Sequence, residues 1–312
     1  MNKILITSIS SKVPLISSIR DSANLKEIYI IGADINEHVV GSHFVDEFWH
    51  MPKLADMSVN EILNFCKKKG VNIIFPTRDG ELKYFAEHYQ EFKQYNISVM
   101  VSDKRSIEIT QDKFLFFKEL RKMGYPVIET TRDINALKCS TFVVKERYGS
   151  GSKNMLININ KEDAISGANY LESPIYQPFI QGKEYSVDVY VNRNGKSKGA
   201  IARERVMVVD GESQITRTIE NEKLTNLSMK LAEDLGLSGH VMFQILLDKH
   251  NNPQIIECNP RIGGASTLSI RAGLSSFQWF ILESNNENLD NYPFIQCSKD
   301  LTLIRYKKDL IL

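Results

Sequence analysis

The sequence lacks a long apolar run, a surplus of charge of either sign and any close pair of cysteines. No apolar stretch approaches the roughly 18 residues that suggest a membrane-spanning helix, so we expect no membrane span. Lysine and arginine together number 39 and aspartate and glutamate 38, which gives a formal charge of +1. Proteins that bind nucleic acid or anionic membranes need a strongly basic face. We therefore expect neither nucleic acid nor a membrane as a partner.

The sequence also gives little sign of cysteine chemistry or of export. The four cysteines lie far apart and form no C-x-x-C pair: Cys66, Cys139, Cys258 and Cys297. The N-terminus, MNKILITSIS, has one lysine and a short apolar burst broken by Thr7 and Ser8, which predicts a first strand rather than a signal peptide. A chain of this size without such a leader is typically reduced, so we expect free thiols and a cytoplasmic location.

Several catalytic motifs are absent as well. The chain has no Walker loop (G-x-x-x-x-G-K-[ST]), no G-x-G-x-x-G after its first strand, no G-x-S-x-G elbow and no H-E-x-x-H pair. Its six histidines show no metal-ligand spacing. These absences argue against a dinucleotide site of the NAD type, a serine hydrolase and a zinc enzyme.

Short apolar runs alternate with helix-length segments over the first hundred residues. The runs predicted as buried strands are Lys3–Ile6, Ile28–Ile31, Val71–Phe75 and Ile97–Val101. Val59–Lys69 is predicted as a helix that ends at Gly70. Strands separated by helices indicate a parallel sheet with helices on its faces. The first part of the chain therefore has a Rossmann-like layout without the dinucleotide fingerprint.

The rest of the chain predicts shorter ribbons followed by long strands. Asp112–Gly124 has apolar residues at helical spacing, and Glu222–Gly236 is an amphipathic helix. The predicted strands are Thr141–Glu146, Met155–Ile159, Tyr176–Ile180, Tyr185–Val191, Gly199–Val209, Val241–Asp248, Gln254–Asn259 and Leu301–Tyr306. We expect the first two to form a small ribbon and the long strands to form a second sheet.

A glycine-rich loop follows the first ribbon strand. Lys145 precedes the run GSGSKN at Gly149–Asn154. Glycines allow a tight turn that brings backbone N–H groups against a phosphate, and the strand lysine supplies a positive charge to the same anion. A plain hairpin tip has the same composition, so the loop alone leaves both interpretations open.

A strong turn signal at Asn194-Gly195 sets the pairing of two long strands. If these two residues form the turn, Glu184 faces Arg205, Ser186 faces Arg203, and Asp188 lies on the same face of the sheet. This charged face is either exposed to solvent or the floor of a nucleotide site, with Arg203 or Arg205 reaching phosphate oxygens.

The most informative pattern lies on the last pair of long strands. If Asp248 and Pro253 close the loop between them, Gln244 lies directly opposite Glu257, and Asn259 points to the same side. Carboxylate and amide oxygens suit Mg²⁺, which keeps some waters and bridges substrate phosphates. A buried hydrogen bond between Gln244 and Glu257 is the alternative.

In this order, these pieces resemble the ATP-grasp superfamily, and most of all the branch formed by the large subunit of carbamoyl-phosphate synthase and its small stand-alone relatives. The similar segments are Asp112-Lys113, VVKERYGSGSKN (Val143–Asn154), QPFIQGKEYSVD (Gln177–Asp188) and FQILLDKHNNPQIIECNPRIGGAS (Phe243–Ser266). The last segment, with its E-x-N-P-R core, is the most specific. The resemblance implies an α/β (α+β) fold with a Rossmann-like N-terminal domain at 1–104, a small lid subdomain at 105–180 and an antiparallel core with a C-terminal subdomain at 181–312.

The resemblance also implies the positions of the nucleotide, the metal and the reacting groups. The residues implied to hold ATP are Lys113 and Lys145 at the phosphates, Ser150, Gly151 and Ser152 in the lid loop, Gln177 at the adenine amino group, the Phe179 and Ile180 backbone at the hinge, and Glu184 at the ribose. Gln177 departs from a position that is often acidic in the family. The implied Mg²⁺ ligands are Gln244, Glu257 and Asn259, and the implied catalytic residues are Arg261, Arg203 and Arg205.

The implied activity is an ATP- and Mg²⁺-dependent ligase that activates a small-molecule carboxylate as an acyl phosphate for attack by an amine. A full carbamoyl-phosphate synthase is not expected, because its large subunit resembles two such modules and this chain has room for one. A small-molecule kinase on the same scaffold and a non-catalytic ATP-binding regulatory subunit remain alternatives, and a homodimer stays open. In the segment Pro76–Glu81, either Asp79 or Glu81 contacts the amine or caps a helix.

Overall fold

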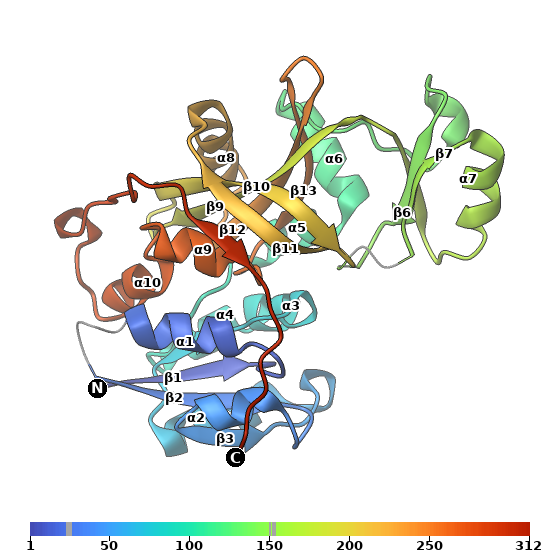
Figure 1. The fold of residues 1–312 in the computed structure, drawn as a ribbon. Coiled ribbons are helices and arrows are strands. Elements are labelled where there is room, and N and C mark those ends of the chain that lie inside the picture. Colours follow the sequence, from blue (N-terminus) through green and yellow to red (C-terminus); the bar gives the residue numbers. More distant parts are fainter. Residues whose placement is uncertain (23–26, 150, 152–153) are drawn as a thin grey trace.

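The N-terminal part of the chain is a parallel sheet covered by helices on both faces (Figure 1). The structure is a computed structural model that describes residues 1–22, 27–149, 151 and 154–312. The elements of this part are β1 (Asn2–Thr7), α1 (Val13–Ser22), β2 (Ile28–Asp34), β3 (Glu47–His50), α2 (Val59–Lys69), β4 (Ile73–Phe75), α3 (Asp79–Glu87), α4 (Tyr89–Gln94) and β5 (Ser98–Val99). The strand order is β3-β2-β1-β4-β5, with every pairing parallel. The predicted Rossmann-like layout is therefore confirmed.

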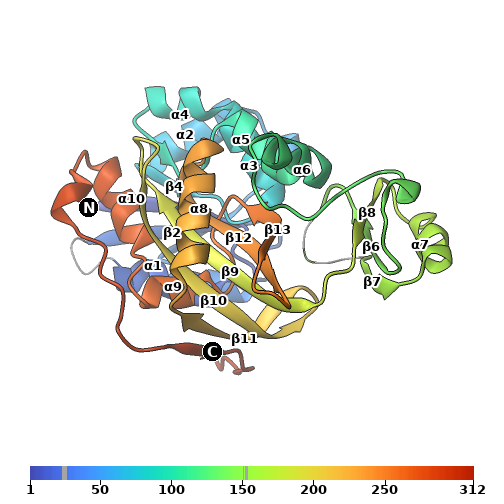
Figure 2. The same ribbon diagram turned by 90° about the horizontal axis from the view of Figure 1, so that it is seen from above.

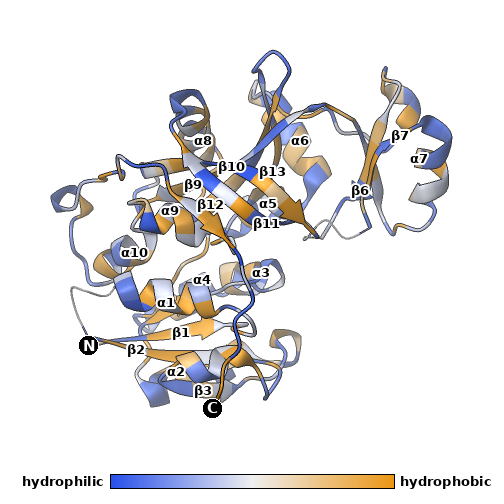
Figure 3. Cartoon of the chain, in the orientation of Figure 1, coloured by the Kyte–Doolittle hydropathy of each residue, from blue (hydrophilic) through white to orange (hydrophobic). Residues whose placement is uncertain are grey.

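Both faces of this sheet are buried, which explains why its strands are apolar throughout. Ile4 and Ile6 of β1 face α1 and the C-terminal helices, whereas Leu5 belongs to a second core with residues of α2 and α3. Figure 3 shows the resulting hydrophobic colouring along β1 and β2. The helix α2 has the predicted bounds, because a capping box of Ser58 and Glu61 begins it and Gly70, at φ +73°, ends it.

The second part of the chain contains two further sheets. Its elements are α5 (Lys104–Gln111), α6 (Lys113–Lys122), β6 (Phe142–Glu146), β7 (Leu156–Ile159), α7 (Lys161–Ala168), β8 (Pro174–Pro178), β9 (Gly182–Val191), β10 (Ser197–Val209), β11 (Glu212–Ile219), α8 (Glu222–Asp234), β12 (Gly239–Asp248), β13 (Pro253–Asn259), α9 (Ser266–Arg271), α10 (Ser276–Ser284) and β14 (Thr302–Ile304). The sheet β7-β6-β8 carries α7 and stands to one side, and we call this unit the lid (Figures 1 and 2).

The six-stranded sheet, in the order β13-β12-β9-β10-β11-β14, forms the centre of the molecule. Its pairings are antiparallel. One face packs against α8, which lies along it in Figure 2, and against α5 and α6. The other face packs against α10, which also contacts α1 of the N-terminal part. This sheet therefore has helices on both faces and a core on each side.

The structure differs from the prediction in several elements and in the packing of two helices. The elements that were not predicted individually are the strands β3 and β11 and the helices α1, α3, α4, α5, α7, α9 and α10. The residues Ile109 of α5, and Phe116 and Leu120 of α6, belong to the same core cluster as the long strands rather than to the core of the lid. Their apolar faces pack on the six-stranded sheet because this sheet presents a larger apolar surface than the lid does. The boundaries at 104 and 180 stay predictions.

The hairpin β12–β13 contains a bulge that changes the loop but preserves the predicted pairing. At its loop end Leu247 pairs with Pro253, one residue away from the predicted Asp248. A register shift further along the strands takes up this difference. As a result Gln244 lies directly opposite Glu257, as predicted.

The hairpin β9–β10 behaves in the same way. A register shift follows its first pair, and beyond it Ser186 lies opposite Arg203 and Asp188 opposite Ile201, as predicted. The predicted apolar face of β9 is also confirmed, because its alternate residues belong to the core under α8: Tyr185, Val187, Val189 and Val191.

Candidate functional site

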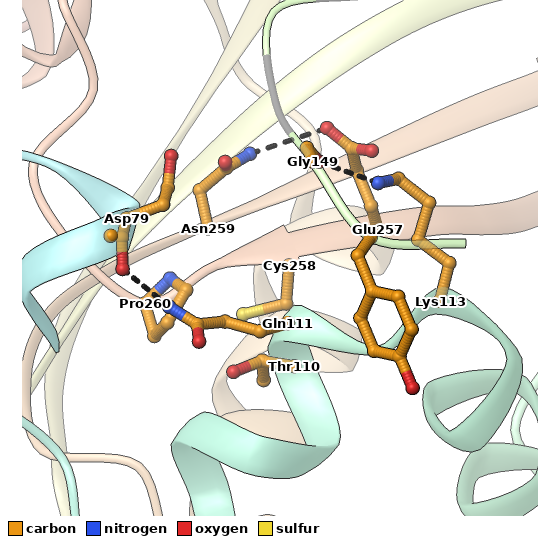
Figure 4. Close-up of a pocket in the computed structure, with 11 residues that line it drawn as sticks. Asp79, Thr110, Gln111, Lys113, Gly149, Glu257, Cys258, Asn259 and Pro260 are labelled. Carbon is orange, nitrogen blue, oxygen red and sulfur yellow. Dashed lines mark hydrogen bonds between the residues drawn. The ribbon is translucent and has the colours of Figure 1, made fainter. Parts of the chain in front are cut away.

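A pocket of about 250 Å³ lies where the lid, the six-stranded sheet and the N-terminal part meet. It is lined by Asp79, Gly80, Thr110, Gln111, Lys113, Tyr148, Gly149, Glu257, Cys258, Asn259 and Pro260. In the view of Figure 4, Asn259 lies between Asp79 and Glu257. The pocket therefore brings together segments that are far apart in the sequence, among them three of the predicted site residues.

The predicted metal ligands form one patch, at the end of β13 and the middle of β12. Glu257 and Asn259 line the pocket, and Asn259 Nδ2 lies 3.5 Å from Glu257 Oε1. Gln244 is the direct cross-strand neighbour of Glu257. In the part of the chain that the structure describes, no group of three or more His, Cys, Asp or Glu could hold a metal ion. The donor set is thus one carboxylate and two amides, which fits a hard cation that takes its remaining oxygens from phosphates and water.

Lys145 of β6 is a buried cation beside this patch. Its residue is 6% exposed, and its ammonium group has neither a hydrogen bond nor an ion pair with any described residue. Burial lowers the pKa of Lys145 to about 8, with the charge of Lys113 acting in the same direction and those of Glu257 and Glu184 opposing it. A buried, unpaired ammonium group is costly, so this side chain is suited to an anionic ligand.

The N-terminus of α6 is tied to the end of β6. Asp112 caps α6 by accepting from the N–H groups of Phe114 and Leu115, and Arg147 donates to both of its carboxylate oxygens, at 2.7 and 2.5 Å. Burial raises the pKa of Asp112, but the hydrogen bonds from Arg147 and the cap outweigh it, so the pKa is lowered. This contact fixes the position of Lys113 relative to the lid.

Lys113 extends from α6 to the glycine loop of the lid. Its Nζ donates to the carbonyl oxygen of Gly149, at 2.6 Å, as Figure 4 shows. Gly149, at φ +115°, and Gly151, at φ +76°, have the left-handed backbone that favours glycine. The predicted lid-loop residues Ser150 and Ser152 lie outside the described residues.

The connection between β8 and β9 carries the predicted adenine contacts. Gln177 is buried, and its Nε2 donates to Thr130 Oγ1 at 2.8 Å. The Phe179 N–H donates to the carbonyl oxygen of Thr141 at 3.0 Å. The Phe179 N–H is therefore occupied within the chain, and Ile180 is the predicted hinge residue whose N–H donates to no other described backbone group.

Glu184 and Arg205 form an ion pair on the face of β9 and β10 that is turned toward Lys145. The Arg205 Nε lies 3.0 Å from Glu184 Oε1, although its N–H has no hydrogen-bond partner in the described structure. Burial and the charge of Glu257 raise the pKa of Glu184, while Arg205 and Lys145 lower it, and the net direction is upward. The predicted neighbourhood of these two side chains is thus present.

Arg203 occupies a different environment from the one predicted for a catalytic residue. Its side chain is 1% exposed, and its Nε donates to Asp188 Oδ2 at 2.7 Å. Asp188 is 0% exposed and also contacts His240 Nε2 at 3.0 Å, Ser266 Oγ and Ser269 Oγ. Burial opposes the ionisation of Asp188, but Arg203 and His240 outweigh it and hold its pKa well below the usual range. Asp188 therefore neutralises the charge of Arg203 in the protein interior.

Arg261 reaches across the pocket to the N-terminal part. Its Nε and Nη2 donate to Asp79 Oδ1 and Oδ2, at 2.9 and 2.6 Å. Asp79 lines the pocket, whereas Glu81 is buried and accepts from the N–H groups of Thr77 and Arg78. The structure thus distinguishes the two acidic residues that the sequence left open, because Glu81 has the capping role and Asp79 faces the pocket.

Several pocket residues were not predicted, among them Thr110, Gln111 and Tyr148. Thr110 and Gln111 lie at the end of α5, a helix that was not predicted, and Tyr148 follows β6. The segment Asp103–Gln111 begins with an N-cap aspartate that accepts from the Ser106 N–H, and this capping signal, followed by Ile107 at helical spacing, was the available clue.

No helix in the described parts of the chain is long and apolar enough to cross a membrane. All four cysteines are free.

Comparisons with known proteins match this geometry. The family described as "PylC-like, N-terminal domain" matches residues 4–100. An uncharacterized protein of Methanocaldococcus jannaschii, MJ0776, is 26% identical over 54% of this chain and 44% of its own length. The carbamoyl phosphate synthase large chain of Thermoanaerobacter pseudethanolicus is 23% identical over 57% of this chain and 19% of its own. The chain therefore spans less than half the length of the curated relatives it matches.

A solved structure confirms the fold. The biotin carboxylase domain of Hydrogenobacter thermophilus 2-oxoglutarate carboxylase, which was solved with MgADP, ADP and bicarbonate, superposes with a TM-score of 0.77. It is 17% identical and the match covers 96% of this chain and 73% of that one. The family described as "ATP-grasp domain" matches residues 110–265, half of the chain, and these residues include the glycine loop, the hinge and the patch of Gln244, Glu257 and Asn259. The chain belongs to the ATP-grasp family.

Proposed function

We propose that this protein is an ATP- and Mg²⁺-dependent ligase that joins a small-molecule carboxylate to an amine through an acyl phosphate. The observation that carries the proposal is the pairing of an oxygen-donor patch, Gln244, Glu257 and Asn259, with the buried and unpaired ammonium group of Lys145. Such a site has donors for a hard cation and a cation for a phosphate. We expect the reaction to take place in the cytoplasm.

The chain's own residues supply binding, orientation and charge. Lys145 and Lys113 would hold the triphosphate, with Gly149 and Gly151 in the loop that closes over it, and Ile180 would present its backbone to the adenine. Glu184 would hold the ribose. Gln244, Glu257 and Asn259 would hold Mg²⁺, which when bound neutralises charge on the triphosphate. We assign Arg203 a positioning role, because its guanidinium is buried against Asp188.

Two group transfers complete the reaction. A carboxylate oxygen forms a bond to the γ-phosphorus, and the bond from that phosphorus to the β–γ bridging oxygen breaks and releases ADP. The lone pair of a deprotonated amine then forms the C–N bond, the C–O bond to the phosphate breaks, and inorganic phosphate leaves with that electron pair. The amine nitrogen loses a further proton to give the neutral amide. No nucleophilic side chain is needed, and exclusion of water protects the acyl phosphate.

The comparisons support this class of chemistry. The named relatives include carbamoyl phosphate synthase large chains, and the solved biotin carboxylase domain contains MgADP and bicarbonate. Of these proteins, the biotin carboxylase domain was solved with a nucleotide and with bicarbonate together. Because the chain matches only part of these relatives, its own carboxylate and amine have to be identified by experiment.

The test is a substrate screen. The protein is incubated with ATP and MgCl₂ and with pairs drawn from a panel of carboxylates and a panel of amines, and ADP and phosphate are measured by coupled assays. We expect the two products in equal amounts only with a matching pair, and the condensed product in the mass spectrum.

Other results would identify the alternatives. A stable phosphorylated product that forms without any amine would show a kinase. Tight ATP binding with no ADP from any pair would show a non-catalytic nucleotide-binding protein. Either result contradicts the ligase assignment.

A further inference from the structure

The loops that follow β1 and β4 lie side by side at the middle of the parallel sheet, joined by hydrogen bonds between Thr77 and the carbonyl oxygens of Thr7 and Ser8. From β1 the chain continues to β2 on one side, and from β4 it continues to β5 on the other. Open α/β sheets bind ligands outside the carboxyl ends of their strands at such a reversal point. Here the reversal point lies beside the candidate nucleotide site, because Asp79 and Gly80, which follow β4, line the same pocket as Glu257 and Asn259.

Two charged residues at this reversal point already have partners within the chain. Glu81 is 6% exposed and accepts from Thr7 Oγ1 at 2.8 Å and Ser8 Oγ at 2.5 Å. Lys12 Nζ donates to both the carbonyl oxygen and the Oγ1 of Thr77, at 2.5 and 2.8 Å. These hydrogen bonds hold the two loops in a fixed position relative to each other.

Asp79 differs from both because its carboxylate faces the pocket. Its side chain is 22% exposed, and Arg261 is its ion-pair partner among the described residues. Its backbone carbonyl accepts from Gln111 Nε2 at 2.5 Å (Figure 4). The position of Asp79 is therefore fixed by the backbone, while its carboxylate has a partner that can be exchanged.

Both members of this ion pair remain partly accessible. Its two side chains are 22% and 18% exposed, so neither is sealed inside the protein and both can be reached by a charged ligand. Arg261 lies two residues after Asn259, so a triphosphate bound at the metal patch offers its guanidinium a doubly charged alternative. When Arg261 leaves, the carboxylate of Asp79 is left without a partner in a partly desolvated pocket.

We infer that Asp79 binds the ammonium group of the acceptor amine, and that the Asp79–Arg261 ion pair is the acceptor-free state of this site. The assignment rests on the proposed ligase function. The incoming ammonium group replaces the guanidinium of Arg261 on Asp79, and Arg261 turns to the anionic phosphoryl group. Bound amine leaves Arg261 without Asp79, and the phosphoryl group then pairs with Arg261. Bound nucleotide draws Arg261 away from Asp79, and the ammonium group then pairs with Asp79. Binding of the amine therefore strengthens binding of the nucleotide, and the reverse. The acceptor is thus an amine that carries a positive charge at neutral pH.

The variant Asp79→Asn tests this inference, because it keeps the shape of the side chain and removes its charge. Hydroxylamine, which is uncharged near pH 8, serves as a nucleophile that does not need the carboxylate, and a carboxylate panel is screened by hydroxamate formation. We expect Asp79→Asn to form hydroxamate and amine-independent ADP severalfold faster than the wild type, because Arg261 is permanently released. With the amine found in the substrate screen, we expect kcat/KM to fall at least about tenfold.

A binding measurement complements the kinetics. Calorimetric titration of the same amine in the presence of ADP and MgCl₂ should give an affinity at least about tenfold weaker for Asp79→Asn than for the wild type. The matched control is Glu212→Gln, which removes the charge of an exposed carboxylate that pairs with Arg305 at 2.7 Å outside the pocket. This control should behave as the wild type in every assay.

The outcomes separate the two proposals. If the wild type forms no hydroxamate with any carboxylate and uses no amine, the ligase function is wrong and this assignment falls with it. If the wild type is active and Asp79→Asn keeps its amine affinity, the ligase function stands and the assignment of Asp79 is wrong. Equal loss of hydroxamate formation and of amine use in Asp79→Asn also contradicts the assignment, because it indicates a general distortion of the site.

Discussion

Glu257 supplies the one carboxylate of the proposed magnesium site, while Gln244 and Asn259 supply neutral amides. We expect Glu257→Gln to lower Mg²⁺-dependent ATP turnover by about 100-fold or more, which is the size of effect seen when one preorganised electrostatic partner is removed. The fold should persist, because the one hydrogen bond of this side chain that the structure describes is the long contact to Asn259, at 3.5 Å.

The measurement for Glu257→Gln is ADP binding with and without MgCl₂. The wild type should bind ADP more tightly when MgCl₂ is present, and the variant should lose this difference while its thermal unfolding stays within a few degrees of the wild type. Glu212→Gln again serves as the control. A variant that keeps the Mg²⁺ enhancement would remove Glu257 from the metal site.

The lowered pKa of Lys145 predicts that nucleotide binding depends on pH. Burial lowers its pKa from 10.5 to about 8 in the free protein, and bound phosphates stabilise its charged form and raise that pKa. Above pH 8 the free protein therefore has a neutral Lys145 and must take up a proton when the nucleotide binds. The affinity for ADP should fall between pH 8 and pH 10, by up to about tenfold per pH unit.

Calorimetry in buffers of different ionisation enthalpy measures this proton uptake directly. The variant Lys145→Met should bind ADP more weakly below pH 8 and show no such slope above it. Lys183→Met, which removes an exposed lysine that pairs with Glu204, should keep the slope. A slope that persists in Lys145→Met would place the titrating group elsewhere.

At the scale of elements, α9 is anchored by a charge buried beneath it. Ser266 and Ser269 of α9 both donate to Asp188 of β9, which is paired with Arg203 of β10. We expect Asp188→Asn to lower the free energy of unfolding by about 3–5 kcal/mol, because it leaves the guanidinium buried without its counter-charge. Urea unfolding measures this loss.

A second variant separates the charge from the packing. The double change Asp188→Leu with Arg203→Met removes both partners, and replacement of a buried pair by apolar residues is often close to neutral. It should therefore be more stable than Asp188→Asn alone. If the double variant is the less stable of the two, hydrogen bonding to the serines rather than charge pairing dominates this network.

The sequence predicted elements well where the signal was local or periodic. The pairing of Gln244 with Glu257 was found from turn residues and strand alternation, although the loop closes one residue away and a bulge restores the register. The strand β11 was missed because Glu212–Ile219 contains few large apolar residues. Contacts such as Asp79 with Arg261, 182 residues apart, carry no local signal at all.

The burial of Arg203 was within reach of the sequence. The predicted register placed Asp188 on the same face as Arg203, and two such residues on neighbouring strands are close enough to pair. The sequence did not predict that α9 and α10 pack over this face of the sheet and exclude water from it. The same face is covered at Arg203 and partly open at Glu184, where the nucleotide site stays a prediction.

At the scale of the whole molecule, the N-terminal sheet and the six-stranded sheet share one core. Ile4, Ile6 and Ile16 of the N-terminal part belong to the same cluster as Phe277 and Trp279 of α10, whereas the lid has a separate small cluster. A continuous core makes unfolding cooperative. We therefore expect the first hundred residues and the six-stranded sheet to unfold as one unit.

The two tryptophans of the chain make this prediction testable. Trp49 of β3 stacks on Phe65, with ring centroids 3.6 Å apart, and Trp279 lies in the shared core. The variant Trp279→Phe thus leaves one fluorescent reporter, Trp49, in the N-terminal sheet. The variant Trp49→Phe leaves the other, Trp279, in α10.

Adding Phe277→Ala to either variant should lower the free energy of unfolding by about 3–5 kcal/mol, the usual cost of a large cavity. Urea unfolding should show the same downward shift in midpoint by both reporters, because the cavity lies in a core that both parts need. A shift confined to the Trp279 reporter would show that the two sheets unfold independently.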